Sequence, residues 1–337
     1  MIVEAHAAGR VNVIGEHTDY AGGLALGMAI DRGTTVRVER GGSVVRLRTD
    51  HDDSEAMVAI DIDATEMATA RIEPEWARFV AGVVAELQPP TGATGTVRSD
   101  LPIAAGLSSS ASLQLAVALA LGFDGNALEL ATTCQRAEQR ATGAPTGILD
   151  QLTIASAVDG AFVLLDCEAR QTSAIPFPSE IAIMCVDSGE RRAVADSAYR
   201  ERRDECVAAE REIGPLRHAT RGDVASIRDD TVRRRAHHVV SENQRVRDFV
   251  DALRDARYGD CGALLLEGHA SLRDDFEVTT PRLDELVSHL ATLPGVYGAR
   301  MTGAGFGGHV IALCRADTDA ADQFGWRARA SQGVRVN

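Results

Sequence analysis

Apolar residues recur every three or four positions in several segments of this chain, with polar residues between them. This spacing places an apolar stripe along a helix, so each of these segments is predicted to be helical. The predicted helices span residues 77–87, 110–121, 126–142, 194–213, 231–257, 258–275 and 281–293. Asn126 followed by Glu129 is typical of a capping box, which indicates that the third helix begins there.

Shorter apolar or alternating segments predict strands. They span residues 3–8, 34–40, 44–48, 94–99, 160–166, 181–186, 296–301 and 309–314. Gly41-Gly42 separates two alternating segments, and a glycine pair in that position indicates a hairpin that joins them. Helices and strands are mixed along the chain without strict alternation, which favours an α+β fold over a doubly wound sheet.

The length of 337 residues exceeds what one compact core usually holds, so we expect two fused lobes. A turn-rich stretch with Pro176 and Pro178 marks the boundary, which predicts domains of residues 1–175 and 176–337. No apolar run approaches the roughly 20 residues that cross a bilayer, and the first residues lack a signal-peptide pattern. The six cysteines include no Cys-x-x-Cys pair, which is typical of thiols in a reducing compartment. We therefore expect a cytoplasmic location.

Acidic residues outnumber basic ones by 49 to 35, which gives a net charge of −14. This charge repels nucleic acid and anionic membranes, so neither is an expected partner. The run Arg233-Arg234-Arg235 is interpreted as a solvated helix face. The sequence contains no lysine, so every one of the 35 basic residues is an arginine. That absence excludes a lysine Schiff base, a Walker A loop and a protein-kinase site of the usual kind.

Residues 9–20 combine many different polar groups in a short segment. They include a guanidinium, a carboxamide, two carboxylates, an imidazole and a phenol, on Arg10, Asn12, Glu16, His17, Asp19 and Tyr20. Sugar hydroxyls both donate and accept hydrogen bonds, so sugar recognition needs such a mixture. A polar surface turn, in which Asn12 and Asp19 close Asx-turns, explains the segment equally well.

Residues 101–112 form a loop with little side-chain bulk that leads into an apolar helix. Gly106 lets the backbone approach a ligand, and the helix start offers free N–H groups and a partial positive charge. Ser108, Ser109 and Ser110 add hydroxyls that can bind phosphate or magnesium. A serine N-cap is the ordinary alternative, but a cap needs only one of the three. Since the chain has no lysine for a P-loop, any phosphate site must use other groups, such as the backbone N–H groups and hydroxyls here. We therefore favour phosphate binding by this loop.

The glycine-rich residues 302–308 are weaker evidence, because they connect two predicted strands and lack the spacing of a dinucleotide-binding loop. They are either a plain β-connection or a loop whose backbone approaches a nucleotide or sugar. Asp150, near a helix start, and Glu138, on the preceding helix, occupy common positions for surface carboxylates. Beside the serine-rich loop they would supply the metal ligand and the carboxylate that phosphoryl transfer needs.

Taken together, these segments resemble those of the GHMP small-molecule kinases, and residues 9–20 closely resemble the galactokinase signature of that family. The resemblance extends over nearly the whole chain. Further similar stretches are residues 137–138 leading to 147–151, 199–203, 238–242 and 272–278. The resemblance implies a two-lobed GHMP kinase fold with the active site in the cleft between the lobes.

Galactokinases transfer a phosphoryl group from MgATP to the anomeric hydroxyl of α-D-galactose, so the resemblance implies ATP and Mg2+ as cofactors and a small sugar as substrate. By matching motif position, it implies Asp150 and Arg10 as catalytic residues, with Arg10 keeping Asp150 ionised. It implies sugar binding by Glu16, His17, Asp19, Gly147, Asp150, Tyr199 and Gly305. It implies ATP binding by Gly106, Leu107, Ser108, Ser109, Ser110 and Ala111, and Mg2+ binding by Ser110 and Glu138.

The sequence departs from the family pattern at Ala8, Gly27 and Ala304, where backbone stiffness changes and the polar groups are kept. The same signature serves kinases of N-acetylgalactosamine and of arabinose, so these sugars are alternatives to galactose. A non-catalytic sensor of galactose and ATP is a third alternative. Sensors of that kind lack the Ser-Ala pair that is present here as Ser110-Ala111. We expect a monomer or a weak homodimer.

Overall fold

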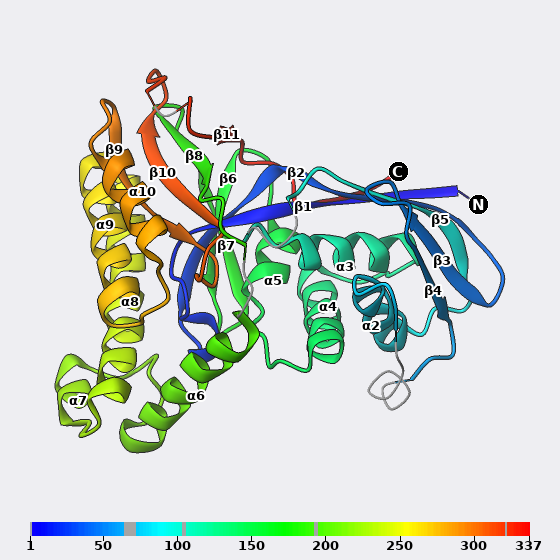
Figure 1. The fold of residues 1–337 in the computed structure, drawn as a ribbon, viewed down its shortest axis with the longest axis horizontal. Helices are drawn as coiled ribbons and strands as arrows, with labels where there is room; N and C mark the ends of the chain where they lie inside the picture. The colour runs from blue at the N-terminus through cyan, green and yellow to red at the C-terminus, as the bar shows by residue number, and fades with distance from the viewer. Residues whose placement is uncertain (1, 64–71, 103–105, 192–194, 321) are drawn as a thin grey trace.

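The computed structural model describes residues 2–63, 72–102, 106–191, 195–320 and 322–337. Ala104 and Ala105 of the serine-rich loop, and residue 194 at the predicted start of a helix, lie outside the described residues. Figure 1 shows two lobes joined by the long strands β1 (Ile2–Ile14) and β2 (Leu24–Arg40). Within the described ranges, no helix has the length and apolar character that crossing a membrane requires.

The first lobe is built on a sheet that has eight strands among the described residues. Its main path runs β12-β1-β2-β5-β3-β4, and β6 and β7 continue it from β2. Besides β1 and β2, these strands are β3 (Val44–Thr49), β4 (Glu55–Ala59), β5 (Ala93–Ser99), β6 (Ala161–Asp166), β7 (Gln171–Pro176) and β12 (Val334–Val336). In β3 and β4 buried and exposed residues alternate, so one face of these strands packs on the core and the other faces solvent.

Helices α2 (Ala77–Leu87), α3 (Ser109–Ala120) and α5 (Leu149–Ser156) pack on this sheet, and α4 (Ala127–Thr142) packs on these three helices. Helix α3 is central: it contacts β1 and β2 and also α2, α4 and α5. Small apolar residues surround its axis, and for this reason most of the helix is buried. Helix α4 begins at the predicted capping box, in which Asn126 and Glu129 each accept the other's backbone N–H.

The second lobe contains a smaller sheet of order β11-β8-β10-β9. Its strands are β8 (Ile181–Asp187), β9 (Val296–Thr302), β10 (His309–Arg315) and β11 (Trp326–Ala328). Its helices are α6 (Ala195–Ile213), α7 (Arg221–Ser226), α8 (Asp230–Arg254), α9 (Tyr258–Asp274) and α10 (Pro281–Ala291). Helices α9 and α10 pack on β9, so the strand with the glycine-rich loop at its end is covered by helices.

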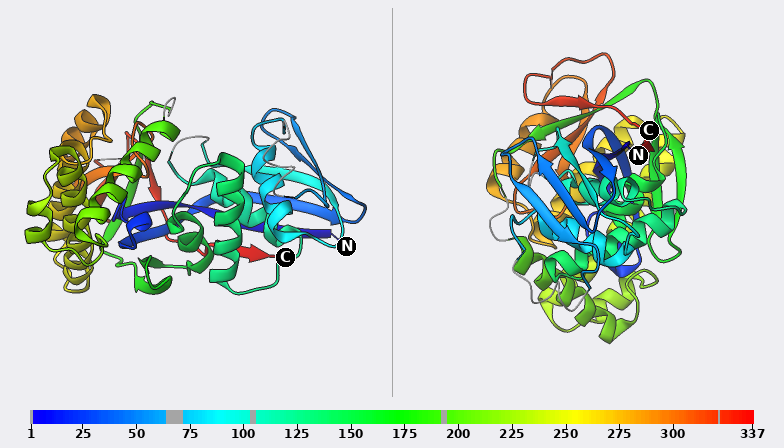
Figure 2. Two further views of the ribbon diagram at one scale, coloured as in Figure 1. Left: turned by 90° about the horizontal axis from the view of Figure 1, so that it is seen from below. Right: turned by 90° about the vertical axis from the view of Figure 1, so that its right-hand side faces the viewer.

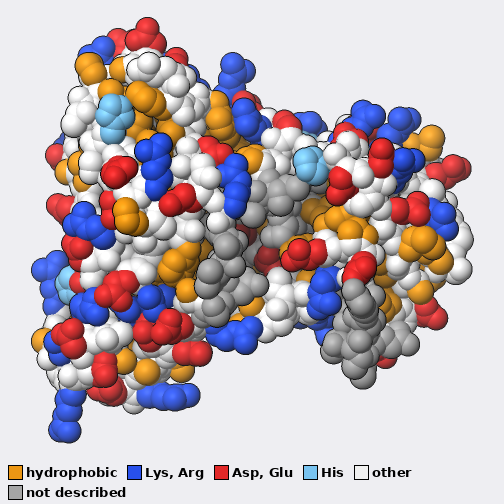
Figure 3. Space-filling model, in the orientation of Figure 1, with side chains coloured by type: hydrophobic (Ala, Val, Ile, Leu, Met, Phe, Trp, Pro, Cys, Tyr) orange, Lys and Arg blue, Asp and Glu red, His pale blue; other side chains and the backbone are white. Residues whose placement is uncertain are grey.

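The two lobes share strands and core. A cluster of buried residues joins Val11 and Ile14 of β1 to Ile183 of β8, Phe249 of α8 and Ile311 of β10. The chain end returns to the first lobe, where β12 pairs with β1 and the two termini lie side by side (Figure 2). In the space-filling view the outline is notched between the lobes, and acidic and basic side chains are mixed over the visible face (Figure 3).

The predicted hairpin at Gly41-Gly42 is wrong. Both flanking segments are strands, but β5 lies between them, antiparallel to β2 and parallel to β3. The N–H of Gly41 donates to the carbonyl of Gly92, and the N–H of Gly92 donates to the carbonyl of Gly42. Alternation in the sequence predicts which segments are strands, whereas the pairing partner is chosen by packing of distant segments.

The predicted solvated arginine face on α8 is also wrong in part. The side chain of Arg235 is buried, where its Nε donates to Glu205 at 2.7 Å and its Nη2 donates to Glu277 at 2.6 Å. Arg233 and Arg234 are partly exposed. Two carboxylates from other elements compensate the buried charge of Arg235, and the sequence of the helix alone does not reveal them.

Candidate active site

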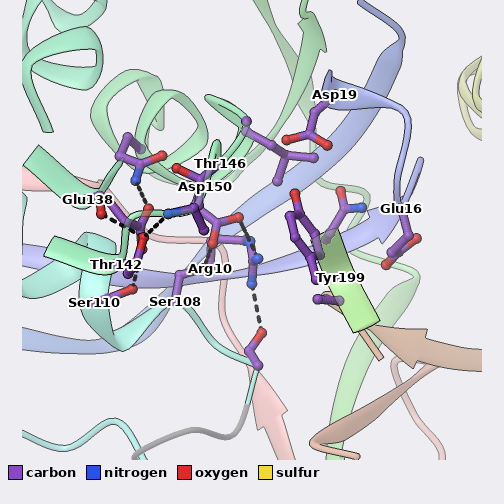
Figure 4. Close-up of a pocket in the computed structure, with 18 of the residues that line it drawn as sticks. Arg10, Glu16, Asp19, Ser108, Ser110, Glu138, Thr142, Thr146, Asp150 and Tyr199 are labelled. Atoms are coloured by element: carbon purple, nitrogen blue, oxygen red, sulfur yellow. Dashed lines mark hydrogen bonds and ion pairs between the residues drawn. The ribbon is translucent and has the colours of Figure 1, made fainter. Parts of the chain in front are cut away.

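A cavity of about 300 Å3 lies where the two lobes meet. Its lining comes from the end of β1 and the turn after it, from helices α2, α4 and α6, from the starts of α3 and α5, and from the glycine-rich loop after β9. The structure therefore brings together segments from both ends of the chain. Figure 4 shows the Arg10–Asp150 pair in the middle, with Ser110 and Glu138 on one side and Asp19, Tyr199 and Glu16 on the other.

The first side of the pocket is formed by a tight turn after β1. Gly15 has a φ of +104°, and a Cβ on it would lie 2.6 Å from the carbonyl oxygen of Leu24. Thr18 is fully buried and its hydroxyl lies 2.9 Å from the carbonyl of Gly15 and 2.7 Å from that of Leu24. The turn therefore needs a glycine and a buried hydroxyl, and it directs Glu16, His17 and Asp19 towards the pocket.

Arg10 and Asp150 form the central contact. Arg10 Nε donates to Asp150 Oδ1 at 2.8 Å, and Nη2 lies 2.5 Å from the same oxygen. Arg10 Nη1 donates to the Gly106 carbonyl at 2.7 Å, so the guanidinium also anchors the serine-rich loop. Ser108 Oγ donates to Asp150 Oδ2 at 2.5 Å. Arg10 and Asp150 are therefore in direct contact, as the sequence predicts.

Ser110 and Glu138 lie together on one side of the Arg10–Asp150 pair (Figure 4). Ser110 Oγ donates to Glu138 Oε1 at 2.8 Å, and Gln151 Nε2 donates to Glu138 Oε2. Burial and, to a smaller extent, the charge of Asp150 raise the pKa of Glu138 to about 7, although the two hydrogen bonds oppose the rise. This end of the pocket is therefore rich in acceptor oxygens and short of positive charge.

The donor set at this end suits Mg2+. Magnesium is usually held by one or two carboxylates together with phosphate oxygens and water. Glu138 offers a carboxylate and Ser110 a hydroxyl, and Arg10 is the only arginine among the pocket-lining residues in the described part of the chain. The described residues hold no cluster of three or more metal-ligating side chains, so a fully protein-built metal cage is not present there.

Asp19, Gly147 and Tyr199 meet at the other end. A Cβ on Gly147 would lie 1.6 Å from Asp19 Oδ2, so the carboxylate occupies the space that a side chain would need. Burial raises the pKa of Asp19 to about 6, and the charge of Asp150 adds to the rise. The Tyr199 ring lies 5.7 Å from that of His17 and 5.8 Å from that of Tyr20. Three of the predicted sugar ligands therefore form one wall.

The glycine-rich loop meets the first turn through His17. His17 Nε2 lies 3.2 Å from the carbonyl oxygen of Ala304, and Gly303 and Ala304 line the pocket. Gly305 has a φ of +83°, and its Cβ position is only 2.3 Å from the carbonyl oxygen of Val278. Among the described residues, Gly305 packs against Val278 and is not part of the pocket lining.

The side chains of two other predicted residues lie outside the described pocket lining. Leu107 and Ala111 are instead each buried in a cluster of hydrophobic residues. The carbonyl of Leu107 accepts the N–H of Arg10 at 3.2 Å, which joins the serine-rich loop to β1. Gly106, Ser108, Ser109 and Ser110 do line the pocket.

Several residues that support the pocket were not predicted. Arg300 of β9 pairs with Glu16 and with Glu242 of α8. The Thr302 hydroxyl accepts the N–H of Asn12 at 3.0 Å and lies 2.9 Å from the carbonyl of the same residue. The sequence does contain one signal that could have indicated Arg300: it is the single charged residue in the buried second half of β9. A charge in such a strand is rare unless it is paired.

The family models match three parts of the chain. Residues 3–40 match the galactokinase galactose-binding signature, residues 77–158 the GHMP kinases N-terminal domain and residues 249–330 the GHMP kinases C-terminal domain. A galactokinase of Bos taurus is 38% identical over 327 residues, which cover 92% of this chain and 83% of the relative. A galactokinase of Exiguobacterium sibiricum is 37% identical over 331 residues, which cover 93% and 84%.

Solved structures are similar over the same length. The Lactococcus lactis galactokinase complexed with galactose has a TM-score of 0.91 and 30% identity, and the match covers 99% of this chain and 95% of that one. The mevalonate kinase of Methanococcus jannaschii has a TM-score of 0.68 and 20% identity, with 100% and 96% covered, and so shares the fold. The predicted α+β, two-lobed fold is confirmed. This chain belongs to the GHMP kinase family, in its galactokinase branch.

Proposed function

We propose that this protein transfers the terminal phosphoryl group of ATP to the anomeric hydroxyl of α-D-galactose, which gives galactose 1-phosphate and ADP. One observation carries the proposal. The Arg10–Asp150 pair lies between a group of sugar-type acceptors and a serine-rich loop at a helix start (Figure 4). A sugar and a triphosphate that occupy the two sides would meet at this pair.

The serine-rich side has the properties of a phosphate site without lysine. Ser108 precedes α3 with a φ of +59°, and the first turn of the helix follows directly. Free N–H groups and the helix dipole at such a start favour bound anions. We assign Gly106 to Ala111 to the phosphates of ATP, with Leu107 and Ala111 acting through the backbone. Ser110 and Glu138 would hold Mg2+, which supplies positive charge that neutralises the phosphate oxygens.

The acidic side has the properties of a sugar site. Glu16 and Asp19 accept hydrogen bonds, and His17 and Tyr199 supply ring surface and further polar atoms. Gly147 leaves the space in which Asp19 lies. The structure of the Lactococcus lactis galactokinase complexed with galactose supports galactose as the sugar. Gly305 would act through its neighbours in the glycine-rich loop, since Gly303 and Ala304 form that edge of the pocket.

Asp150 and Arg10 act on the reacting atoms. The C1 oxygen of the sugar forms a bond to the terminal phosphorus while the bond from that phosphorus to the ADP oxygen breaks, and the hydroxyl proton passes to Asp150. Asp150 Oδ1 is held by Arg10, so Oδ2, which now accepts from Ser108, is the oxygen that can turn to the sugar. Arg10 also offsets the negative charge that collects around the transferred group.

A panel of free sugars with MgATP tests the proposal, with ADP release as the measurement. Galactose should give the highest kcat/KM, above N-acetylgalactosamine, arabinose and glucose. Turnover of a different sugar with none of galactose would correct the substrate and leave the kinase reaction. Galactose binding without ADP release, measured by calorimetry beside the assay, would instead identify a sensor and overturn the proposed activity.

A further inference from the structure

Arg300 lies fully buried behind the pocket, between two carboxylates. Its Nη2 donates to Glu16 Oε2, and its Nη1 donates to Glu242 Oε1 at 2.8 Å. No side chain of the three is more than 2% exposed. Among the residues that the structure describes, the Nε of Arg300 has no hydrogen-bond partner, so the two carboxylates hold the guanidinium. Of the three residues, Glu16 alone is in the described pocket lining.

The same cluster holds the backbone of the turn. Glu242 Oε1 accepts the N–H of Gly15 at 2.9 Å, and its Oε2 accepts from Arg245 Nε at 2.6 Å. Helix α8 therefore fixes the backbone just before Glu16, while β9 fixes the carboxylate of Glu16. Burial raises the pKa of Glu16 to about 7, and the charge of Arg300 is the largest influence that opposes this rise. Without Arg300, the carboxylate would lose both its direction and its main counter-charge.

We propose that Arg300 is a positioning residue for sugar recognition: it holds the Glu16 carboxylate charged and directed at one hydroxyl of the bound sugar. The inference rests on the proposed function, in which Glu16 is a sugar ligand. Glu16 lies on the opposite side of the Arg10–Asp150 pair from Ser110 and Glu138 (Figure 4). The hydroxyl that it binds is therefore remote from ATP, and the loss of Arg300 should weaken sugar binding without weakening nucleotide binding.

Helix α9 contains a second feature that belongs to this arrangement. A Cβ on Gly268 would lie 2.5 Å from Arg300 Nη1 and 3.2 Å from Glu242 Oε2. Gly268 is buried within a helix, where alanine is otherwise the preferred small residue. The glycine thus leaves the space in which the guanidinium lies. Because the nearest atom is the end of a flexible side chain, Gly268→Ala displaces that end and removes no polar group.

The first experiment compares Arg300→Met and Arg300→Lys with the wild type in steady-state kinetics. Arg300→Met should raise KM for galactose roughly 10- to 100-fold, as loss of an outer partner does at other sites, while KM for ATP stays within about twofold. Arg300→Lys restores the charge but not the two-pronged geometry, so its KM for galactose should be intermediate. Arg235→Met is the matched control, because Arg235 is also buried between two carboxylates, those of Glu205 and Glu277, and does not pair with Glu16. Its KM for galactose should stay within about threefold of wild type.

The second experiment uses Gly268→Ala, which stays informative if the Arg300 variants fail to fold. This variant should raise KM for galactose about 2- to 10-fold with an unchanged KM for ATP. Gly259→Ala on the same helix is its control, because no atom lies within 4 Å of that Cβ position. The assay is repeated with monodeoxy galactoses. With the sugar that lacks the hydroxyl bound by Glu16, the ratio of variant to wild-type KM should fall to about one.

Three outcomes would overturn the role of Arg300. The first is an unchanged KM for galactose in both Arg300→Met and Gly268→Ala. The second is a ratio of variant to wild-type KM that is the same for every deoxy sugar. The third is a rise in KM for galactose and for ATP together, in proportion to a fall in Tm. Failure of the proposed function is a separate result, since it is seen in the wild type as no turnover of galactose. If another sugar is turned over, the same KM ratios are measured with that sugar.

Discussion

At the scale of single residues, the described lining of the pocket contains four carboxylates, those of Glu16, Asp19, Glu138 and Asp150. Burial raises the pKa of Glu16 and Glu138 to about 7 and that of Asp19 to about 6. These three groups therefore change charge within the range of pH in which a cell works. The fourth carboxylate, on Asp150, is paired with Arg10 through Oδ1 and accepts from Ser108 through Oδ2.

Asp150→Asn should lower kcat by roughly 10²- to 10⁴-fold with little change in fold. The amide keeps the shape of the side chain but cannot accept the sugar proton, and it loses the ion pair with Arg10. A coupled assay of ADP release gives kcat, and circular dichroism checks the fold. Ser108→Ala serves for comparison. It should lower kcat less than Asp150→Asn does, because it removes one hydrogen bond and leaves the carboxylate. Near-normal kcat in Asp150→Asn would remove Asp150 from the reaction.

KM for galactose should rise as pH falls from 8 to 6. The sugar hydroxyls donate to the ionised Glu16, and its pKa of about 7 means that protonation removes this acceptor below neutral pH. The charged groups that act on Glu16 are Arg300 of β9, Glu242 of α8 and Arg10 of β1. The slope should approach about tenfold per pH unit below the pKa. In Glu16→Gln the KM should be higher and nearly flat from pH 8 to 7, and a flat wild-type profile down to pH 6 would contradict the assignment.

The residues at the centre of the proposed site could be predicted from the sequence because their segments carry a recognisable motif. Arg10, Asp150, Ser110 and Glu138 do lie together as predicted. The partners of Arg300 could not be predicted in this way, since they come from the turn after β1 and from α8, more than 50 residues away along the chain. A lone arginine in an apolar strand indicates a buried charge, but the side chains that pair with it depend on packing between distant segments.

At the scale of elements, the starts of α3 and α5 face the same strand end. Ser108 precedes α3, and Asp150 lies in the first turn of α5, so both helices present their N-terminal ends at the pocket. Most helices and strands could be predicted from periodicity and capping residues, as at Asn126. The partner of β3 could not, because β5 follows β4 in the sequence yet lies between β2 and β3.

Gly147→Ala should raise KM for galactose by about tenfold or more and leave KM for ATP unchanged. The new methyl group would occupy the position of Asp19 Oδ2 at the start of α5, so the carboxylate must move away. Gly222→Ala on α7 is a control of the same chemistry, because the nearest atom to its Cβ position is 3.5 Å away. Equal KM values for the Gly147→Ala variant and wild type would show that Asp19 does not bind the sugar.

At the scale of the whole molecule, the pocket is assembled from both lobes. The division at residue 175 stays a prediction, and the structure adds that residues 334–336 lie in the sheet of the first lobe. The cytoplasmic location, the weak self-association and the absence of nucleic-acid and membrane partners also stay predictions. Net charge bears on them only generally, and neither the fold nor the pocket tests them.

Removal of residues 334–337 should lower the free energy of unfolding by roughly 1–3 kcal/mol and leave kcat nearly unchanged. The strand β12 pairs with Ala5, His6 and Ala7, away from the pocket, and its loss leaves the edge of β1 unpaired. Urea unfolding measures the first quantity and the coupled assay the second. Loss of activity at full stability would mean that the chain end acts on the site instead.

Strand β1 carries both Arg10 and, at its end, the turn with Glu16 and Asp19. The distance between Arg10 and the proposed sugar ligands is therefore set by one continuous stretch of backbone. The pairing of this stretch with β2 has irregularities on either side of Arg10. A residue inserted or deleted between them would turn every later side chain to the opposite face. Natural length variation in this protein and its relatives should therefore avoid residues 10–19 and accumulate at sites such as Gly41-Gly42, where the structure leaves open space.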